Sequence, residues 1–390
     1  MNNDQHKYLA KSVNDLKPSG IRRFFDLASK MENVISLGVG EPDFVTPWNV
    51  IEASYHSLEQ GYTAYTANAG LLELRQQISK YLRVNYSVDY NPENQVIVTV
   101  GASQAIDITL RAILNPGEEV IVVEPSFVSY APAVTLAGGT PITIDTKPEN
   151  EFKVTPEQIE AVVTEKTKAI ILCSPNNPTG TVLAESELAS IASVIKKHDL
   201  LVISDEIYAE LTYDESFTSI ASLEGMIDRT IIISGFSKAF AMTGWRLGYA
   251  TGPASIIQAM TKIHQYTIMC APTMAQHGAL EALTNGGDSV RDMKTSYRQR
   301  RNFVVKAFKD MGLSCHQPGG AFYVFPSIKE TGLSSEEFAE QLLQEEKVAV
   351  VPGNVFGVSG EGYIRCSYAT SFKQLDESMK RISNFVKKRM

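Results

Sequence analysis

Short apolar runs rich in valine and isoleucine alternate with helix-like segments through the middle of the chain. Five such runs occupy residues 95–100, 120–123, 169–173, 201–204 and 230–233. Helical periodicity marks residues 72–84, 102–113 and 185–197 between or beside them. Because strands that alternate with helices usually share one sheet with helices packed on it, the pattern predicts an α/β fold.

The chain length and a change of pattern near residue 285 indicate more than one domain. The 390 residues exceed what one compact core usually holds. After residue 285 come a long cation-rich helical segment at 292–309 and apolar runs within 319–326, 348–353 and 363–368. We expect an N-terminal segment, 1–45, that joins a small α+β C-terminal domain, 286–390. Residues 46–285 are predicted to form the large domain.

Composition excludes several classes of function. The net charge of −8 lacks the basic excess of a nucleic-acid-binding protein. There is no run of about 18 apolar residues to cross a membrane, and residues 1–11 lack the apolar core of a signal peptide. Neither the four cysteines nor the six histidines are spaced like metal ligands. We therefore expect no metal, no nucleic-acid or membrane partner, and a cytoplasmic location.

The segment Ser234 to Tyr249 carries the most informative polar residues. Lys238 follows the apolar run 230–233, where burial lowers the pKa of an amine and makes it nucleophilic toward a carbonyl. Arg246 lies eight residues later and can grip an anion bidentately. An amine beside an anion clamp suits a cofactor that is both an aldehyde and a phosphate ester. A surface lysine after a core strand is the alternative.

Three other strand ends also carry polar residues. The turn at 101–103 lies between a strand and a helix, whose first free amides can bind an anion. The loop 174–180 holds Asn177 between two prolines, a rigid setting for a hydrogen-bond donor. Asp205 ends the fourth run, where it can keep a pyridine nitrogen protonated or cap a following helix.

The pattern Ser-x-x-Ser-Lys, followed by Gly-x-Arg-x-Gly, resembles the cofactor-lysine signature of class I and II aminotransferases, which are pyridoxal 5′-phosphate (PLP) enzymes of fold type I. The likeness extends over nearly the whole chain. It implies a mostly parallel seven-stranded sheet in the large domain, PLP as cofactor, and a homodimer.

The resemblance assigns a role to each matching residue. Lys238 forms a Schiff base with the cofactor, Asp205 contacts the pyridine nitrogen, and Tyr208 contacts O3′. Lys238, Asp205 and Tyr208 are thus the catalytic residues. The remaining cofactor contacts are expected from Gly101, Ala102, Ser103, Phe127, Asn177, Ser237 and Arg246, and from Tyr65 of the neighbouring subunit. For Phe127 a place in the core, and for Tyr65 a packed loop position, are the structural alternatives.

The substrate contacts implied by the resemblance are Gly40, Asn177, Arg365 and Ile21. Arg365 interrupts a strand-like run, so it is either a salt-bridge partner or the clamp for the α-carboxylate of an amino acid. The segment 21–27, predicted to be helical, has two adjacent phenylalanines and suggests a pocket for apolar or aromatic side chains. It resembles the start of aromatic-amino-acid and N-acetyl-diaminopimelate aminotransferases. No arginine is clearly dedicated to a second carboxylate, although Arg22 and Arg23 are candidates.

These residues predict transfer of an amino group from an L-amino acid, aromatic or of broad type, to a 2-oxo acid such as 2-oxoglutarate. Lys238 would move the α-proton, and the kinetics would be ping-pong. A C–S lyase or ring-closing synthase of the same fold shares the cofactor residues and remains the alternative. A ligand-sensing regulator is disfavoured, because the 35 or so residues before the domain contain no helix-turn-helix pattern.

Overall fold

The computed structural model describes residues 8–16, 18, 20 and 31–390. Its main feature is a seven-stranded sheet in the order β2-β8-β7-β6-β5-β3-β4. The strands are β2 (Val96–Thr99), β3 (Glu119–Glu124), β4 (Thr140–Asp145), β5 (Thr167–Cys173), β6 (Leu201–Asp205), β7 (Thr230–Gly235) and β8 (Gly248–Thr251). Only β8 runs opposite to its neighbours, so the mostly parallel α/β sheet predicted from the sequence is confirmed.

Two strands of this sheet, β4 and β8, were not picked out by their own sequences. β4 lies at the sheet edge, where most of its residues are exposed or half-buried. A strand of this kind has no continuous apolar run to identify it. β8 is fully buried but only four residues long, and it begins with a glycine. Its place in the sheet depends on its long-range pairing with β2 and β7.

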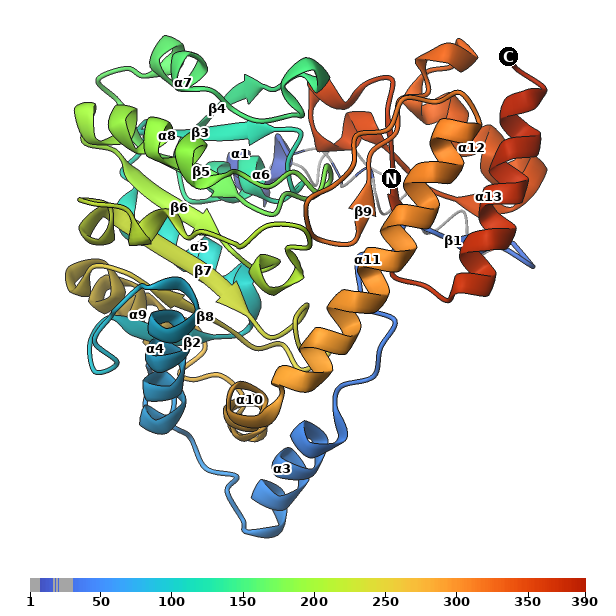
Figure 1. Ribbon diagram of the computed structural model, residues 1–390. Helices are drawn as coiled ribbons and strands as arrows, with labels where there is room; N and C mark the ends of the chain where they lie inside the picture. The colour runs from blue at the N-terminus through green and yellow to red at the C-terminus, as the bar shows by residue number, and fades with distance from the viewer. Residues whose placement is uncertain (1–7, 17, 19, 21–30) are drawn as a thin grey trace.

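Helices cover both faces of the sheet (Figure 1). One face packs against α5 (Gly101–Ile113), α6 (Tyr130–Leu136) and α9 (Ala254–Thr267). The other packs against α4 (Leu72–Tyr86), α7 (Pro156–Val162), α8 (Glu185–Lys197) and α10 (Thr273–Asn285). Next to α10 lies α3 (Trp48–Glu59). The sheet is thus buried on both sides, as parallel sheets generally are.

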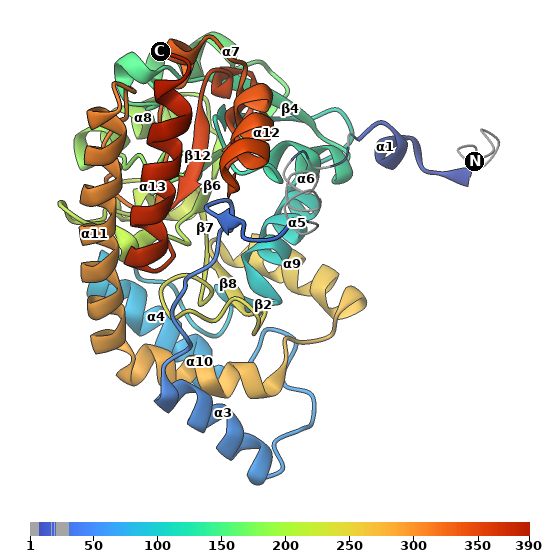
Figure 2. The same ribbon diagram turned by 90° about the vertical axis from the view of Figure 1, so that its right-hand side faces the viewer.

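The C-terminal part of the chain builds a second core around a three-stranded antiparallel sheet. Its strands are β9 (Tyr323–Val324), β11 (Val351–Pro352) and β12 (Ile364–Ser367), in the order β11-β12-β9. Against it pack α11 (Gly287–Asp310), α12 (Ser335–Glu346) and α13 (Phe372–Lys387), which lie side by side in Figure 2.

The predicted apolar run 348–353 divides between two sheets. Its first half is β10 (Val348–Ala349), which pairs in parallel with β1 (Ile35–Ser36), and its second half is β11. The N-terminal segment therefore joins the second core through a backbone ladder. The domain boundaries at 45/46 and 285/286 stay predictions.

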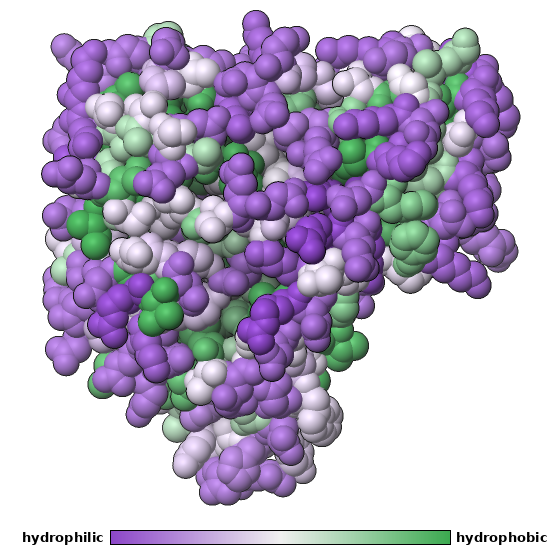
Figure 3. All heavy atoms as spheres, in the orientation of Figure 1, coloured by the Kyte–Doolittle hydropathy of each residue, from purple (hydrophilic) through white to green (hydrophobic). Residues whose placement is uncertain are grey.

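The remaining helix of the described chain, α1 (Lys11–Asn14), projects away from the main body in Figure 2. The face of the molecule in Figure 3 is mostly hydrophilic, with apolar atoms in separate small groups. Among the described residues, no helix is both long and apolar enough to cross a membrane. The helix predicted from residue 21, with Ile21, Arg22 and Arg23, lies outside the described residues.

Candidate active site

One edge of the seven-stranded sheet gathers the polar residues singled out in the sequence. The carboxyl ends of parallel strands meet at one edge, which brings together the segments that follow β2, β3, β5, β6 and β7. Since β8 runs the other way, its amino end reaches the same edge, and Arg246 lies just before it. Residues distant in sequence therefore face one space.

That space is a cavity of about 660 Å³ between the sheet edge and the second core. Eleven of the predicted residues line it: Gly40, Ala102, Ser103, Phe127, Asn177, Asp205, Tyr208, Ser237, Lys238, Arg246 and Arg365. Its size lies in the range of small-molecule sites. The cavity draws residues from both cores, so a ligand in it would touch both.

Lys238 lies in the turn after β7 and lines the cavity. Its Nζ donates a 2.6 Å hydrogen bond to the Gly40 carbonyl and lies 5.8 Å from the centre of the Tyr208 ring. Burial lowers the pKa of the amine to about 8, and the Arg365 and Arg246 charges act in the same direction, while Glu41 and Asp205 oppose them. Near neutral pH this amine therefore exchanges its proton far more readily than a surface lysine does.

Asp205, at the end of β6, is buried and held by two donors. The Tyr130 hydroxyl donates to Oδ2 at 2.6 Å, and the Ile207 amide donates to Oδ1 at 3.2 Å. Burial raises the pKa of the carboxyl, although both hydrogen bonds and the Lys238 charge work against that rise. A cation brought next to Asp205 would stabilise the carboxylate. The predicted helix-capping role of Asp205 is wrong, because the short helix after β6, Ala209–Leu211, begins after Tyr208, and the Ile207 amide bound by Asp205 lies in the connecting turn.

The amino end of α5 lies at one end of the cavity, where its free amides are suited to an anion. No side chain of the described chain caps this helix, which leaves the first-turn amides near Ala102 and Ser103 open to a ligand. Gly101 has φ +78°, and a Cβ there would lie 2.8 Å from Arg246 Nη2. The glycine thus lets the Arg246 guanidinium lie against the start of the helix. Positive charge and free donors coincide at this end.

Arg365 is a buried cation at the other end of the cavity. Nη1 donates to Asn177 Oδ1 at 2.9 Å, and Nη2 donates to the Gly38 carbonyl at 2.7 Å. Nε has no partner among the described residues, and no carboxylate there pairs with the guanidinium. Burial lowers the pKa of Arg365. The salt-bridge alternative therefore finds no partner in the described chain, whereas an incoming anion would supply the missing charge.

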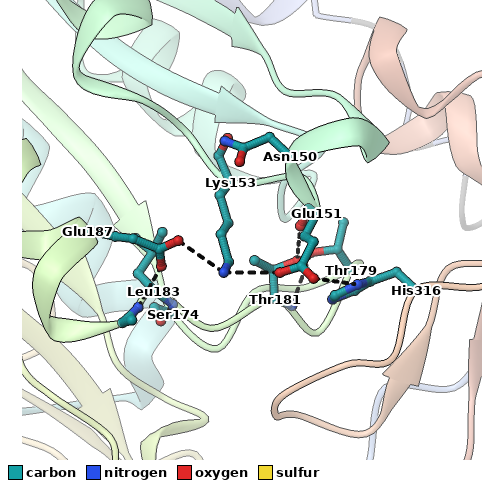
Figure 4. A network of polar contacts seen from close by, with 10 residues as sticks. Asn150, Glu151, Lys153, Ser174, Thr179, Thr181, Leu183, Glu187 and His316 are labelled. Atoms are coloured by element: carbon teal, nitrogen blue, oxygen red, sulfur yellow. Dashed lines mark hydrogen bonds and ion pairs between the residues drawn. The ribbon is translucent and has the colours of Figure 1, made fainter.

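The loop that presents Asn177 is braced by a polar network, shown in Figure 4. Lys153 Nζ lies 3.0 Å from carboxylate oxygens of both Glu151 and Glu187. The Thr181 hydroxyl donates to the Glu151 carbonyl at 2.7 Å. His316 Nδ1, from the segment before β9, is 4.0 Å from Glu151. The Thr181 contact ties the carboxyl end of the Asn177 loop to this network.

Three predicted residues do not line the cavity. Gly101 lies directly behind Arg246, as described above. Tyr65 has 78% of its surface exposed and is absent from the lining. Ile21 lies outside the described residues. The sequence predictions also missed residues that the structure places in the site, among them Tyr130 beside Asp205 and Tyr323 beside Arg365. Both belong to strand-end segments, but nothing local in the sequence identifies their partners.

The residues present suit pyridoxal phosphate. This cofactor needs donors for its phosphate, a buried carboxylate for its ring nitrogen, and a reactive amine for its aldehyde. The amino end of α5 and Arg246 offer the donors, Asp205 offers the carboxylate, and Lys238 offers the amine. The Phe127 ring lies on the same cavity wall and packs edge-on to Tyr130, 5.6 Å between centres.

This fold and this set of site residues are those of the fold type I class of pyridoxal-phosphate enzymes. The sequence profile of the aminotransferase class I and II family matches residues 32–382. A Bacillus subtilis protein named putative aminotransferase YugH is 64% identical over 98% of this chain and 99% of its own length. An aspartate aminotransferase of Pyrococcus abyssi is 48% identical over 96% of this chain and 97% of its own. The crystal structure of an aromatic aminotransferase from Pyrococcus horikoshii OT3 superposes with a TM-score of 0.90, at 46% identity, over 95% of this chain and 99% of that one.

The chain belongs to the aminotransferase class I and II family, and it is an aminotransferase. The resemblance drawn from the sequence is confirmed. The family uses pyridoxal phosphate and acts on amino and 2-oxo acids.

Proposed function

We propose that this chain binds pyridoxal phosphate in the cavity described above. It moves an amino group from an L-amino acid to a 2-oxo acid such as 2-oxoglutarate, and its specificity for the amino acid is aromatic or broad. The observation that carries the proposal is one cavity with a buried amine of lowered pKa at its centre, an anion site at one end and an unpaired buried arginine at the other. The lyase and ring-closing alternatives lose weight because the relatives compared above are named aminotransferases.

Each residue has a defined task in this proposal. Ala102, Ser103 and Arg246 hold the phosphate, with Gly101 allowing their close approach and Ser237 beside them. Asp205, fixed by Tyr130, keeps the proton on the ring nitrogen. Asn177 and Tyr208 contact O3′, and Phe127 covers the ring. When bound, the cofactor supplies an electron-withdrawing ring that stabilises negative charge at the substrate α-carbon.

Lys238 and Arg365 carry out the steps on the substrate. Arg365 binds the α-carboxylate through its two terminal nitrogens, assisted by Asn177 and the Gly40 loop. This holds the α-hydrogen toward Lys238. Once free, the Lys238 amine would take that proton from the α-carbon, and it would also be placed to deliver the proton to a bound cofactor. Two half-reactions in sequence give ping-pong kinetics.

The preference for apolar or aromatic donors rests on the charges of the cavity wall. Among the described lining residues the cations are Lys238, Arg246 and Arg365, and each already has a task above. The exposed Glu41 adds negative charge at the rim. No described lining cation is therefore left for the second carboxylate of aspartate. The aspartate aminotransferases among the relatives make aspartate the competing donor.

Half-reaction screening tests the substrate class. The holoenzyme is mixed with single amino acids without an oxo acid, and conversion of the cofactor to its amine form is followed by absorbance. We expect tyrosine and phenylalanine to convert it faster than aspartate. A strict preference for aspartate would contradict the aromatic assignment. A lyase would instead return to its starting spectrum and release a cleaved product.

The Lys238→Ala variant tests the cofactor assignment. We expect it to lose the absorbance of the lysine-linked cofactor and nearly all turnover. Normal turnover in this variant would show that a group other than Lys238 binds the cofactor aldehyde and moves the proton.

We further propose a homodimer in which Tyr65 contacts the phosphate bound by the partner subunit. The proposal is supported by exposed aromatic residues that cluster on α3 and the segment after it, namely Trp48, Tyr55, Tyr62 and Tyr65. Exposed apolar groups of this kind commonly mark interfaces. Sedimentation analysis should give a dimer, and Tyr65→Phe should weaken cofactor binding. A monomer with full activity would contradict both statements.

The three-part division of the chain and a cytoplasmic location complete the proposal. The division is supported by the β1–β10 ladder and by the start of α11 at Gly287. The location is supported by four cysteines that are all free. Limited proteolysis near residues 45 and 285 and cell fractionation test these two points.

A further inference from the structure

We propose that Tyr323 is a positioning residue for the reaction: its hydroxyl orients the hydroxyl of Tyr208, and its ring holds the guanidinium of Arg365. One side chain then links the O3′ end of the cofactor to the carboxylate clamp. The inference rests on the proposed function, because it takes Tyr208 and Arg365 in the roles given above.

Strand pairing places Tyr323 beside Arg365. Tyr323 begins β9, which is antiparallel to β12, and it lies opposite Ser367. Arg365 is two residues from Ser367 and thus on the same face of the sheet, diagonally across from Tyr323, within reach of long side chains. Only 1% of Tyr323 is exposed to solvent, yet it lines the cavity.

The backbone before Tyr323 is fixed in an unusual conformation. Ala321 has φ +58°, which a residue with a side chain keeps only where its surroundings determine it. Its carbonyl accepts hydrogen bonds from Tyr213 and Tyr368, and its amide donates to the Leu211 carbonyl at 2.9 Å. Leu211 lies three residues after Tyr208. The start of β9 is thereby locked to the segment that carries Tyr208.

The two phenol hydroxyls are in direct contact. Tyr323 and Tyr208 oxygens lie 2.9 Å apart. Burial raises the pKa of both phenols, and the Arg365 charge counters that rise at both. The Arg365 guanidinium lies over the Tyr323 ring, and a cation against that ring draws electron density from its hydroxyl, which makes Tyr323 the better donor of the pair. When it donates to Tyr208, the Tyr208 proton is free to point into the cavity toward O3′.

The Tyr323 ring also fixes the clamp. The Arg365 Cζ lies 4.5 Å from the centre of the Tyr323 ring and 4.9 Å from that of Phe356. Contact with the electron-rich ring faces stabilises a buried guanidinium and restricts its plane. The Asn177 and Gly38 oxygens then set its direction within that plane. Tyr323 thus serves both ends of the site through different atoms.

Two variants of the holoenzyme separate these contacts. Tyr323→Phe keeps the ring and removes the hydroxyl, whereas Tyr323→Leu removes both. The readouts are the pH midpoint of the cofactor absorbance and the Kd of 3-phenylpropionate, a carboxylate with no amino group to react. We expect Y323F to raise the midpoint by about half a pH unit, because O3′ loses a well-aligned donor and holds the neighbouring proton more tightly. Its Kd should stay within about twofold of the wild type.

For Y323L we expect the same rise in midpoint and a Kd about 2- to 30-fold weaker, since the guanidinium loses one ring face. In a Tyr208→Phe background, Y323F should cause no further change in midpoint, because the hydroxyl acts through Tyr208. Tyr90→Phe is the matched control: it removes another buried hydroxyl, which donates to the Ile227 and Thr230 carbonyls and does not line the cavity, and it should move neither readout.

An unchanged midpoint in Y323F, or a shift that persists in the Y208F background, would overturn the link to Tyr208. An unchanged Kd in Y323L would overturn the link to Arg365. If Y323L does not fold, the proposal is judged on the absorbance midpoints of Y323F, Y208F and the double variant. A wild-type protein that takes up no pyridoxal phosphate, or whose Lys238→Ala variant keeps its turnover, would instead refute the proposed function. The two failures are therefore distinguishable.

Discussion

Two buried arginines in this protein have opposite surroundings. Arg301 on α11 is 2% exposed and contacts both carboxylate oxygens of Asp214, at 2.5 and 3.2 Å, and the Pro318 carbonyl at 2.9 Å. Arg365 on β12 is 4% exposed and has only neutral partners among the described residues. Both carry a charge that burial penalises.

The difference separates a structural arginine from a binding arginine. Arg301 has its counter-charge within the fold, so its interaction is complete without a ligand. Arg365 is held in place by an amide oxygen, a carbonyl and two rings, none of which neutralises it. In the proposed function a bound anion supplies this counter-charge. Burial alone does not mark a functional charge, whereas burial without a counter-charge does.

The largest effect is expected from Arg365→Leu. We expect kcat/KM for amino acids to fall about a hundred- to thousandfold, because a desolvated charge pair with the substrate is lost. The melting temperature of the apoprotein should not fall, since the fold no longer buries an unpaired charge. Steady-state kinetics and thermal unfolding measure the two quantities. A large loss of stability with near-normal kcat/KM would show that Arg365 is a structural arginine rather than a binding one.

Arg301→Met should have the opposite profile. We expect the free energy of unfolding to fall by about 1–3 kcal/mol, because the carbonyl of Pro318 loses its donor and Asp214 loses its partner. Asp214 is half exposed, which keeps the cost below that of a fully buried pair. KM of the folded enzyme should change little. Chemical denaturation with kinetics on the same samples is the test, and a substrate-binding defect without loss of stability would contradict it.

Lys238 gives a smaller, pH-dependent effect, because an amine can resolve its burial by losing a proton. Its folded pKa of about 8 lies below the ordinary lysine value of 10.5. Between these values the unfolded chain holds a proton that the folded chain lacks, so this group adds stability to the apoprotein as pH rises from about 8 to 10.5. Denaturation at several pH values should show the gain. Lys238→Met is the control and should lack it.

The lowered pKa of Lys238 also predicts that the rate of cofactor capture by the apoprotein rises with pH and levels off above about 8, since only the free amine reacts. Stopped-flow absorbance measures it. A rate that kept rising to pH 10 would indicate an ordinary lysine.

Much of the sheet and of its functional edge was readable from sequence because the information is local. Strands β5, β6 and β7 each contain an apolar run, and each has a polar site residue at its carboxyl end or in the loop just beyond it, namely Asn177, Asp205 and Lys238. A parallel sheet then collects those residues whatever lies between them. The family resemblance added the role of each one.

Only the tertiary structure distinguished the two arginines. Arg301 belongs to the cation-rich helical segment 292–309, and its burial depends on Asp214, far away in the chain. For Arg365 the sequence left a salt bridge and a ligand clamp open, and the choice depends on which side chains surround it in space. The contact of Tyr323 with Tyr208 likewise joins residues 115 positions apart. The sequence by itself determined the elements and the chemical groups at their ends, because hydrophobic period and turn chemistry act over a few residues. The pairing of charges was decided by the packing of two cores, since a counter-charge can come from any part of the chain.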